Sequence, residues 1–273
     1  MSKIFIANDG ESKEYEEYQV NALWKQGVLN ADALYWREGM ADWRPLTEYF
    51  AKANIASAQA APPVVRYSYT KNPRTLTQVL VVLLGLFLGM KFVSIAGDMS
   101  QLSLLSGVFS ENAAGANDSR QQMIGLAYLA VFLTTAVVFA MWTYRANVNA
   151  RGFGAGWMEI SPGWAVGSYF IPFLNLVRPY QAMKEIWNAS TNPHESSKAT
   201  NAAVGVWWGL WLLSGFLGQI SLRLSMDADT VEKLKSATVA SMASSIVGIP
   251  LTLMAIIVVK SIARKQERLV TGR

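Results

Sequence analysis

The sequence predicts a mostly α-helical fold: a polytopic membrane domain with four spans plus a re-entrant or interfacial segment, preceded by a small N-terminal α+β domain. Of the 273 residues, 52% are hydrophobic and only 16% are charged, whereas soluble domains carry about a quarter charged residues. Four apolar segments, at 76–95, 123–144, 202–220 and 239–259, each reach the roughly 20 residues that a helix needs to cross a bilayer. A fifth apolar segment, at 161–177, is interrupted by proline and glycine.

Residues 1–50 have the pattern of a small soluble domain. Residues 3–7 and 34–36 favour strands, and Asn8-Asp9-Gly10 is typical of a turn. Residues 14–26 indicate a helix, which Gly27 ends. We therefore divide the chain into this domain, a linker at 51–74 with a stiff Pro62-Pro63 pair, a membrane domain at 75–262 and a basic tail at 263–273.

Two runs of the N-terminal domain resemble the bacterial variety of the GYF domain, Gly27-Val28-Leu29-Asn30 and Leu34-Tyr35-Trp36-Arg37-Glu38-Gly39-Met40-Ala41-Asp42-Trp43-Arg44-Pro45-Leu46. The chain departs from that family at its start, where Ile4-Phe5 replaces a frequent Trp-Tyr. The resemblance implies a small α+β module, and the founding members bind proline-rich peptides on an aromatic surface. We predict that Tyr15, Trp36 and Trp43 contact a peptide segment of a cytoplasmic partner.

The basic residues predict the orientation of the spans. They cluster before the first span, between the second and third spans, and after the fourth, whereas the loop at 96–122 contains only Arg120. We therefore expect a multi-pass protein of a bacterial inner membrane with both termini in the cytoplasm. If residues 161–177 crossed the bilayer, the basic tail would lie outside, so the same rule favours a re-entrant or interfacial segment over a fifth span.

A second resemblance covers roughly residues 75–262. The runs that carry it are Asn149-Ala150-Arg151, Ser161-Pro162-Gly163-Trp164-Ala165-Val166-Gly167, Ile171-Pro172, Asn175 and Arg178-Pro179-Tyr180-Gln181-Ala182-Met183-Lys184-Glu185-Ile186-Trp187. They resemble a bacterial membrane family known only as a domain of unknown function, in which four spans surround this signature. The resemblance implies a fold and a location but no activity.

The signature contains residues suited to a membrane interface, namely Trp164, Pro172, Asn175, Arg178, Tyr180, Lys184 and Trp187. Residues 174–188 have the pattern of an amphipathic helix with one aromatic side. One interpretation is a structural collar that caps the bundle. The other is a gate or a docking site for a lipid headgroup, in which Arg178 and Lys184 contact phosphate while Tyr180 and Trp187 anchor the helix.

The spans contain small residues at four-residue intervals, such as Gly85 and Gly89, so they pack on one another or on a second copy of the chain. One charged residue, Lys91, lies within the first span. We expect its side chain to extend toward the outer interface, the alternative being a role in an ion pathway.

The chain offers little for catalysis. It has one histidine, His194, and no cysteine, so we expect no metal site, no cofactor and no enzyme activity. Basic patches interleaved with aromatic residues are missing from the sequence, which argues against nucleic acid as a partner. The expected function is a membrane-anchored interaction or adaptor protein, whose partners are the bilayer, a cytoplasmic protein bound by residues 1–50 and, in a homo-oligomer, a second copy. The alternative is a small-solute channel or transporter gated by the broken segment 161–187.

Overall fold

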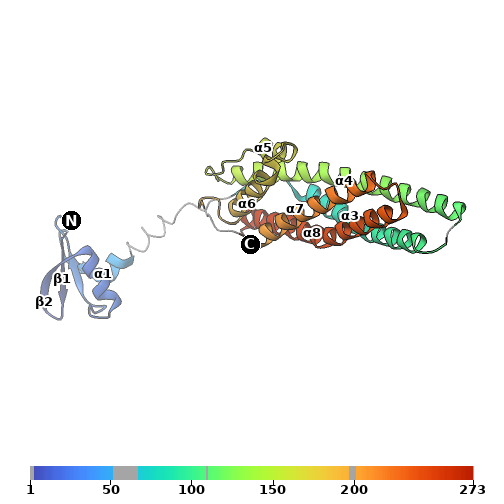
Figure 1. Cartoon of the computed structure of the whole chain (residues 1–273). Coiled ribbons are helices and arrows are strands. Elements are labelled where there is room, and N and C mark those ends of the chain that lie inside the picture. The colour runs from blue at the N-terminus through green and yellow to red at the C-terminus, as the bar shows by residue number, and fades with distance from the viewer. Residues whose placement is uncertain (1–2, 52–66, 109, 197–200, 273) are drawn as a thin grey trace. The chain divides into compact units, whose positions relative to one another are not determined.

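The computed structural model describes residues 3–51, 67–108, 110–196 and 201–272. It divides into two compact units, Met1–Val65 and Arg66–Arg273. Each unit has its own helices (Figure 1) and its own hydrophobic core. The predicted linker falls mostly outside the described residues.

The N-terminal unit is a four-stranded antiparallel sheet with a helix, as predicted for a small α+β domain. Its elements are β1 (Lys3–Asn8), β2 (Glu11–Glu16), α1 (Glu17–Lys25), β3 (Leu34–Trp36) and β4 (Arg44–Pro45), and the strand order is β2-β1-β3-β4. Ile4 and Ile6 alternate along β1 and are buried in the core together with Val20 of α1 and Tyr35 of β3.

The predicted helix at 14–26 was wrong at its beginning, because residues 11–16 form β2. Asp9 and Gly10 both have positive φ angles, 51° and 84°, and two such residues in succession make the turn that connects a tight hairpin. The register pairs Asn8 with Glu11 and continues to the other end of the strands. The helix begins after Glu16, whose side chain forms a capping box with Gln19.

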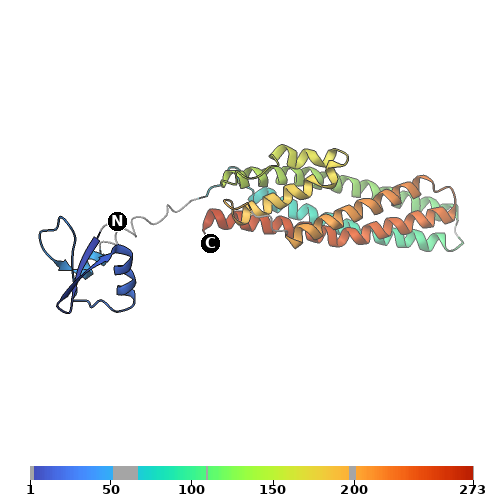
Figure 2. The same cartoon turned by 60° about the vertical axis from the view of Figure 1, so that its left-hand side comes forward.

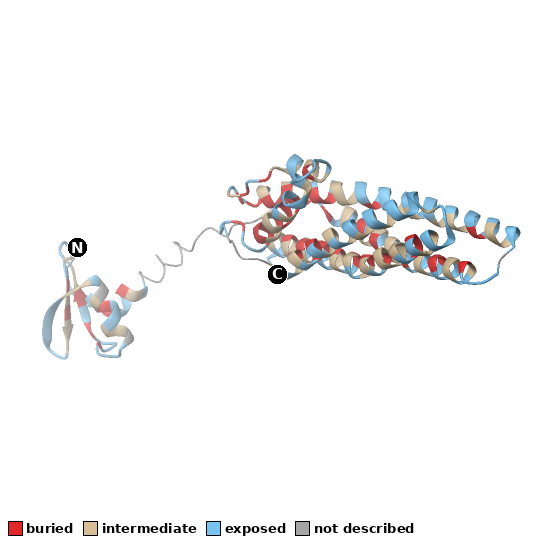
Figure 3. Ribbon diagram, viewed as in Figure 1, coloured by how far each residue is buried: buried red, intermediate tan, exposed pale blue. Residues whose placement is uncertain are grey.

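The second unit contains four helices long and apolar enough to cross a membrane, which confirms the four predicted spans. They are α3 (Arg74–Leu105), α4 (Glu111–Gly152), α7 (Ala202–Met226) and α8 (Val231–Thr271), and each extends past the apolar segment that predicts it. The helices run side by side (Figure 2), and α8, which continues through the predicted tail, packs against α3 and α7. Exposed residues run along the outer surfaces of these helices (Figure 3). Many of them are apolar, such as Leu86, Leu133 and Ile257, which suits a lipid environment.

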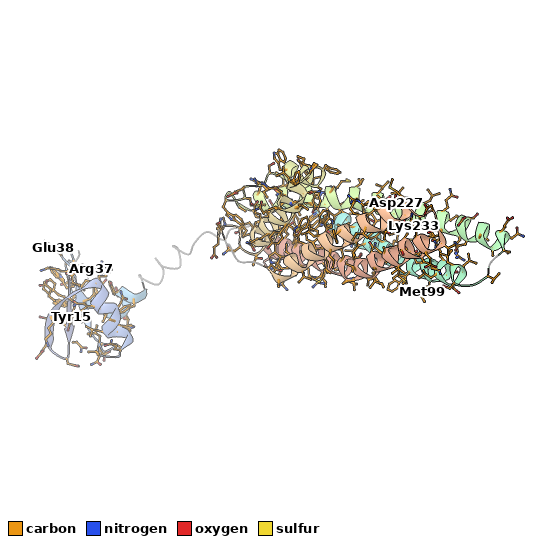
Figure 4. The ribbon with its side chains drawn as sticks, viewed as in Figure 1. Tyr15, Arg37, Glu38, Met99, Asp227 and Lys233 are labelled. Carbon is orange, nitrogen blue, oxygen red and sulfur yellow. The ribbon has the colours of Figure 1, made fainter. Side chains whose placement is uncertain are left out.

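The broken segment does not form a fifth span. It folds into α5 (Pro162–Gly167), two single 3-10 turns, η1 (Ser168–Phe170) and η2 (Leu174–Leu176), and then α6 (Arg178–Thr191), which are too short to cross a bilayer. All of them lie at the end of the bundle where α8 ends (Figure 1). Asp227 and Lys233 border the loop between α7 and α8 and lie toward the other end (Figure 4).

Lys91 differs from the expectation that it extends toward the outer interface. Its side chain is buried, with 4% exposed, and Nζ lies 2.5 Å from the hydroxyl of Tyr128 on α4. The ammonium also lies 4.8 Å from the ring centre of Phe87 and 4.7 Å from that of Tyr128. Two aromatic faces and a hydroxyl hold the cation inside the bundle, so it has no need to reach the aqueous surface.

Candidate functional site

The broken segment contains a cavity of about 280 Å³, which we call the α5 pocket. Its walls come from the loop after α4, from α5, η1 and η2, and from the beginning of α6. The lining residues are Glu159, Ile160, Ser161, Trp164, Ser168, Leu174 and Arg178. The lining thus brings two oppositely charged groups, two hydroxyl groups and an indole together at one end of the bundle.

The loop wall of the pocket is held by two polar side chains of α4. Asn147, which is fully buried, donates from Nδ2 to the carbonyl oxygen of Ile160 at 3.0 Å. Arg151 donates to the carbonyl oxygen of Met158 at 2.8 Å and to Oδ1 of Asn147 at 3.1 Å. These bonds satisfy buried backbone groups of an irregular segment, which water cannot reach.

Glu185 of α6 holds the same wall from the other side. Its Oε2 accepts a hydrogen bond from the backbone N–H of Ile160 at 3.0 Å. Burial raises the pKa of the Glu185 carboxyl, although the N–H groups of Ile160 and Glu159 and the guanidinium of Arg151 act in the opposite direction. The hydrogen bond from Ile160 to Glu185 therefore connects α6 to the loop that forms the pocket wall.

We expect Glu185→Ala to lower the free energy of unfolding by about 1–3 kcal/mol, because it leaves the buried N–H of Ile160 without an acceptor. Glu185→Gln keeps an oxygen acceptor and is expected to lose less. The raised pKa of Glu185 favours the protonated carboxyl in the folded chain, so its contribution is complete at low pH and is lost as the pH rises through the folded-state pKa. Denaturation by detergent titration at several pH values measures both effects, and Glu185→Gln should lack this pH-dependent step. An equal loss for both variants would contradict the assignment.

The α5 helix begins as its sequence dictates. Ser161 is the N-cap, and its side chain accepts from the backbone N–H of Trp164 at 3.4 Å, with Pro162 in the first turn. This cap fixes the first turn of α5, in which the Trp164 side chain is 55% exposed. The Ser161-Pro162 pair is thus the local sequence signal for α5, the helix that forms one wall of the pocket.

Ser168 is the most unusual polar residue of the pocket. It is fully buried, and its hydroxyl has no hydrogen-bond partner among the described residues. Leaving a buried hydroxyl unpaired costs about 1–3 kcal/mol. Ser168 borders the pocket but has no exposed surface, so a molecule inside the pocket supplies the missing partner only if the lining shifts.

An apolar flank, defined as the exposed hydrophobic residues after α5, borders the pocket. Phe173 is 84% exposed and has a φ of 65°, a strained conformation for a residue other than glycine. The residue thus combines a strained backbone with a large apolar side chain that is exposed. The other members of the flank are Phe170, Ile171, Leu174, Leu176 and Val177, and such a surface suits immersion in the membrane interface.

The structure brings only two of the predicted interface residues into the α5 pocket, Trp164 and Arg178. Pro172 is exposed and lies in the apolar flank, where its carbonyl oxygen accepts from the N–H of Leu174. Asn175 is half-buried in η2.

The remaining three predicted residues lie on α6 and do not line the α5 pocket. Tyr180 and Trp187 are half-buried and pack against the core of the bundle, and the ammonium of Lys265 lies 5.1 Å from the Trp187 ring centre. Lys184 is half-buried on the same helix. Sequence reasoning missed Glu159 and Ser168, since an isolated Glu and an isolated Ser carry no local signal of a shared pocket.

The N-terminal unit places Tyr15 and Trp36, two of its three predicted contact residues, on opposite faces of the sheet. Tyr15 lies opposite Ile4 in the register and packs against the core (Figure 4), whereas Trp36 lies opposite Phe5 on the other face of the sheet. The rings of Trp36 and Phe5 are 5.6 Å apart. Trp43 is 41% exposed in the connection before β4.

Comparisons with known protein families identify both parts of the chain. The family model described as a domain of unknown function (DUF4328) matches residues 106–264, which is more than half of the chain and begins one helix later than the resemblance noted from the sequence. The model described as GYF domain 2 matches residues 5–49. Searches of curated proteins and of solved structures returned no match.

Proposed function

Because the chain belongs to the DUF4328 family and residues 5–49 match GYF domain 2, we propose that it is a membrane-anchored adaptor of a bacterial inner membrane. In this proposal both termini lie in the cytoplasm. The N-terminal unit binds an extended, proline-containing segment of a cytoplasmic protein. The four spans hold that unit at the membrane, and no catalytic step is involved.

The observation that carries the proposal is the apolar face of the N-terminal sheet, on the side opposite the core. In the register Phe5 pairs with Trp36, Ala7 pairs with Leu34, and Leu34 pairs with Pro45, so these side chains share one face. Leu34 is 38% exposed, Pro45 is exposed, and the two rings are half-buried. Aromatic and apolar side chains in a row are the usual surface for a polyproline-type segment.

The beginning of the second unit supplies the anchor. Asn149, which is fully buried on α4, accepts from the N–H of Lys71 and donates to its carbonyl oxygen, both at 2.8 Å. Arg145 donates to the carbonyl oxygen of Asn72 at 2.7 Å. The chain is therefore fixed to the bundle just before α3, at the end where the basic residues predict the cytoplasm.

The test measures binding of a fluorescent proline-rich peptide to the full chain in lipid nanodiscs by anisotropy, with a peptide whose prolines are replaced by alanine as reference. We expect Leu34→Glu to weaken binding about tenfold or more, because it places a charge in the apolar face. Val28→Glu is the matched control, since Val28 is exposed outside the sheet. Equal binding of the two peptides, or equal effects of the two variants, would contradict the proposal.

A second candidate function is a small-solute channel or transporter in which 161–187 forms the gate. A polar contact between two spans favours it, because Lys91 of α3 faces the hydroxyl of Tyr128 of α4. Intramembrane polar groups commonly mark substrate pathways. Solute flux into proteoliposomes that Lys91→Met reduces would favour this candidate over the adaptor.

A further inference from the structure

We propose that the α5 pocket binds the zwitterionic headgroup of a phospholipid, that is, a phosphate diester joined to an amine. The lining combines a guanidinium, a carboxylate, two hydroxyl groups and an indole in a space of about 280 Å³, a size suited to a small polar group. The inference is independent of the adaptor function, because it concerns the membrane unit alone.

The phosphate half of the ligand belongs beside Arg178. This residue begins α6, is exposed, and forms no ion pair with any residue of the described part of the chain. A guanidinium matches phosphate oxygens through two parallel hydrogen bonds. The N-terminus of α6, at the same place, adds a favourable dipole for an anion.

Ser168 is the independent observation that points to a ligand. Its side chain is fully buried, lines the pocket, and has a hydroxyl without a partner within the described ranges. Buried hydroxyl groups in proteins are nearly always paired. Because Ser168 has no exposed surface, the lining must shift when the ligand enters, and a phosphate oxygen would then accept the hydrogen bond that the protein leaves unmade.

The amine half belongs beside Glu159. This carboxylate lines the same pocket as Arg178 and is exposed, and among the described residues it has no cationic partner within ion-pair distance. Trp164 supplies an aromatic face, which attracts an ammonium group. A negative and a positive group in one small pocket favour a ligand with both charges over an anionic headgroup.

The apolar flank identifies a lipid, not a free metabolite, as the source of the headgroup. Leu174 belongs both to the pocket lining and to the flank, so the apolar surface is continuous with the polar site. Phe170 and Phe173 are 80% and 84% exposed. Acyl chains would cover these rings while the headgroup occupies the pocket.

The test reconstitutes the full chain into phosphatidylglycerol vesicles that contain a trace of spin-labelled phosphatidylethanolamine or spin-labelled phosphatidylglycerol. Electron paramagnetic resonance gives the fraction of each label that the protein immobilises. We expect the ethanolamine lipid to be selected over the glycerol lipid by about threefold to tenfold, the size of one partly exposed charge pair. Equal immobilisation, or selection of the glycerol lipid, would overturn the proposal.

Variants assign the selection to the pocket. Glu159→Gln should abolish the preference for ethanolamine lipid, Arg178→Gln should weaken both lipids, and Ser168→Ala should weaken both by a smaller factor. Lys184→Gln is the control, because Lys184 is a cation of α6 outside the lining. Unchanged selection in Glu159→Gln, or an equal loss in Lys184→Gln, would contradict the assignment.

Soluble competitors distinguish the source of the phosphate. We expect millimolar inorganic phosphate and O-phosphoethanolamine to leave the labelled lipid bound, since the acyl chains contribute much of the affinity. Complete displacement by inorganic phosphate would show a site for free anions and would overturn the lipid proposal. A loss of peptide binding by the N-terminal unit would leave all of these results unchanged, so the two proposals fail separately.

Discussion

Replacing Trp142 by alanine is expected to lower the free energy of unfolding by about 3 kcal/mol. Trp142 is 1% exposed and belongs to the core in which α4 packs on its neighbours. Its indole N–H donates to the hydroxyl of Thr77 on α3 at 3.1 Å. The expected loss is at the lower end for a core tryptophan, because a bilayer does not supply the transfer energy that water does.

One further variant separates the hydrogen bond of Trp142 from its packing, and a second serves as a control. Trp142→Phe removes the hydrogen bond but keeps most of the volume, so it should cost about 1 kcal/mol. Trp164→Ala removes the same side chain from an exposed position and should change the free energy of unfolding by less than about 0.5 kcal/mol. Titration with sodium dodecyl sulfate in mixed micelles measures all three, and similar losses for Trp142→Ala and Trp164→Ala would contradict the packing described here.

The second large effect is expected for Asn147→Ala, at about 2–4 kcal/mol. This substitution leaves the carbonyl oxygen of Ile160 without its donor and removes an acceptor from Arg151. Ile160 lines the α5 pocket and Arg151 donates to the carbonyl oxygen of Met158 in the same loop, so the wall should loosen as well as the fold. Asn192→Ala is the control, because Asn192 is an exposed asparagine whose side chain donates a hydrogen bond to Oε2 of Glu195, outside the pocket lining.

Loosening of the pocket wall by Asn147→Ala can be measured separately, as the rate of cysteine labelling. A cysteine placed at Ser168 is buried in the intact pocket and should react slowly with a thiol reagent, while Asn147→Ala should accelerate that reaction. Since the chain has no native cysteine, the signal comes from this position alone. An unchanged rate of labelling would show that Asn147 does not hold the wall.

The spans could be predicted from the sequence because a bilayer imposes one demand on every crossing helix, a long apolar run. The hairpin of the N-terminal unit could be predicted only in part. The turn at Asn8-Asp9-Gly10 has a local signal, but β2 consists of Glu-Ser-Lys-Glu-Tyr-Glu, which is too polar to show an alternating strand pattern. Its pairing with β1 fixes the strand, and that contact is invisible in a local window.

The α5 pocket shows the same limit. Ser161-Pro162 marks the beginning of a helix, so one wall has a local signal. Glu159, Ser168 and Arg178 line one pocket. The loop at Ile160 is held there by hydrogen bonds from Asn147 of α4 and to Glu185 of α6, two helices that are distant in the sequence. The prediction that Lys91 extends toward the outer interface was wrong for a related reason. One of the aromatic residues that hold its ammonium group, Tyr128, lies on another helix.

The most direct test asks on which side of the membrane the segment with the α5 pocket lies. Single cysteines at Asn112, in the first turns of α4, and at Asn192, just after α6, both occupy exposed positions. Intact cells of an expression host are treated with an impermeant thiol reagent before and after permeabilisation. We predict that Asn112→Cys reacts in intact cells and that Asn192→Cys reacts only after permeabilisation. Reaction of Asn192→Cys in intact cells would contradict the four-span arrangement with a cytoplasmic pocket.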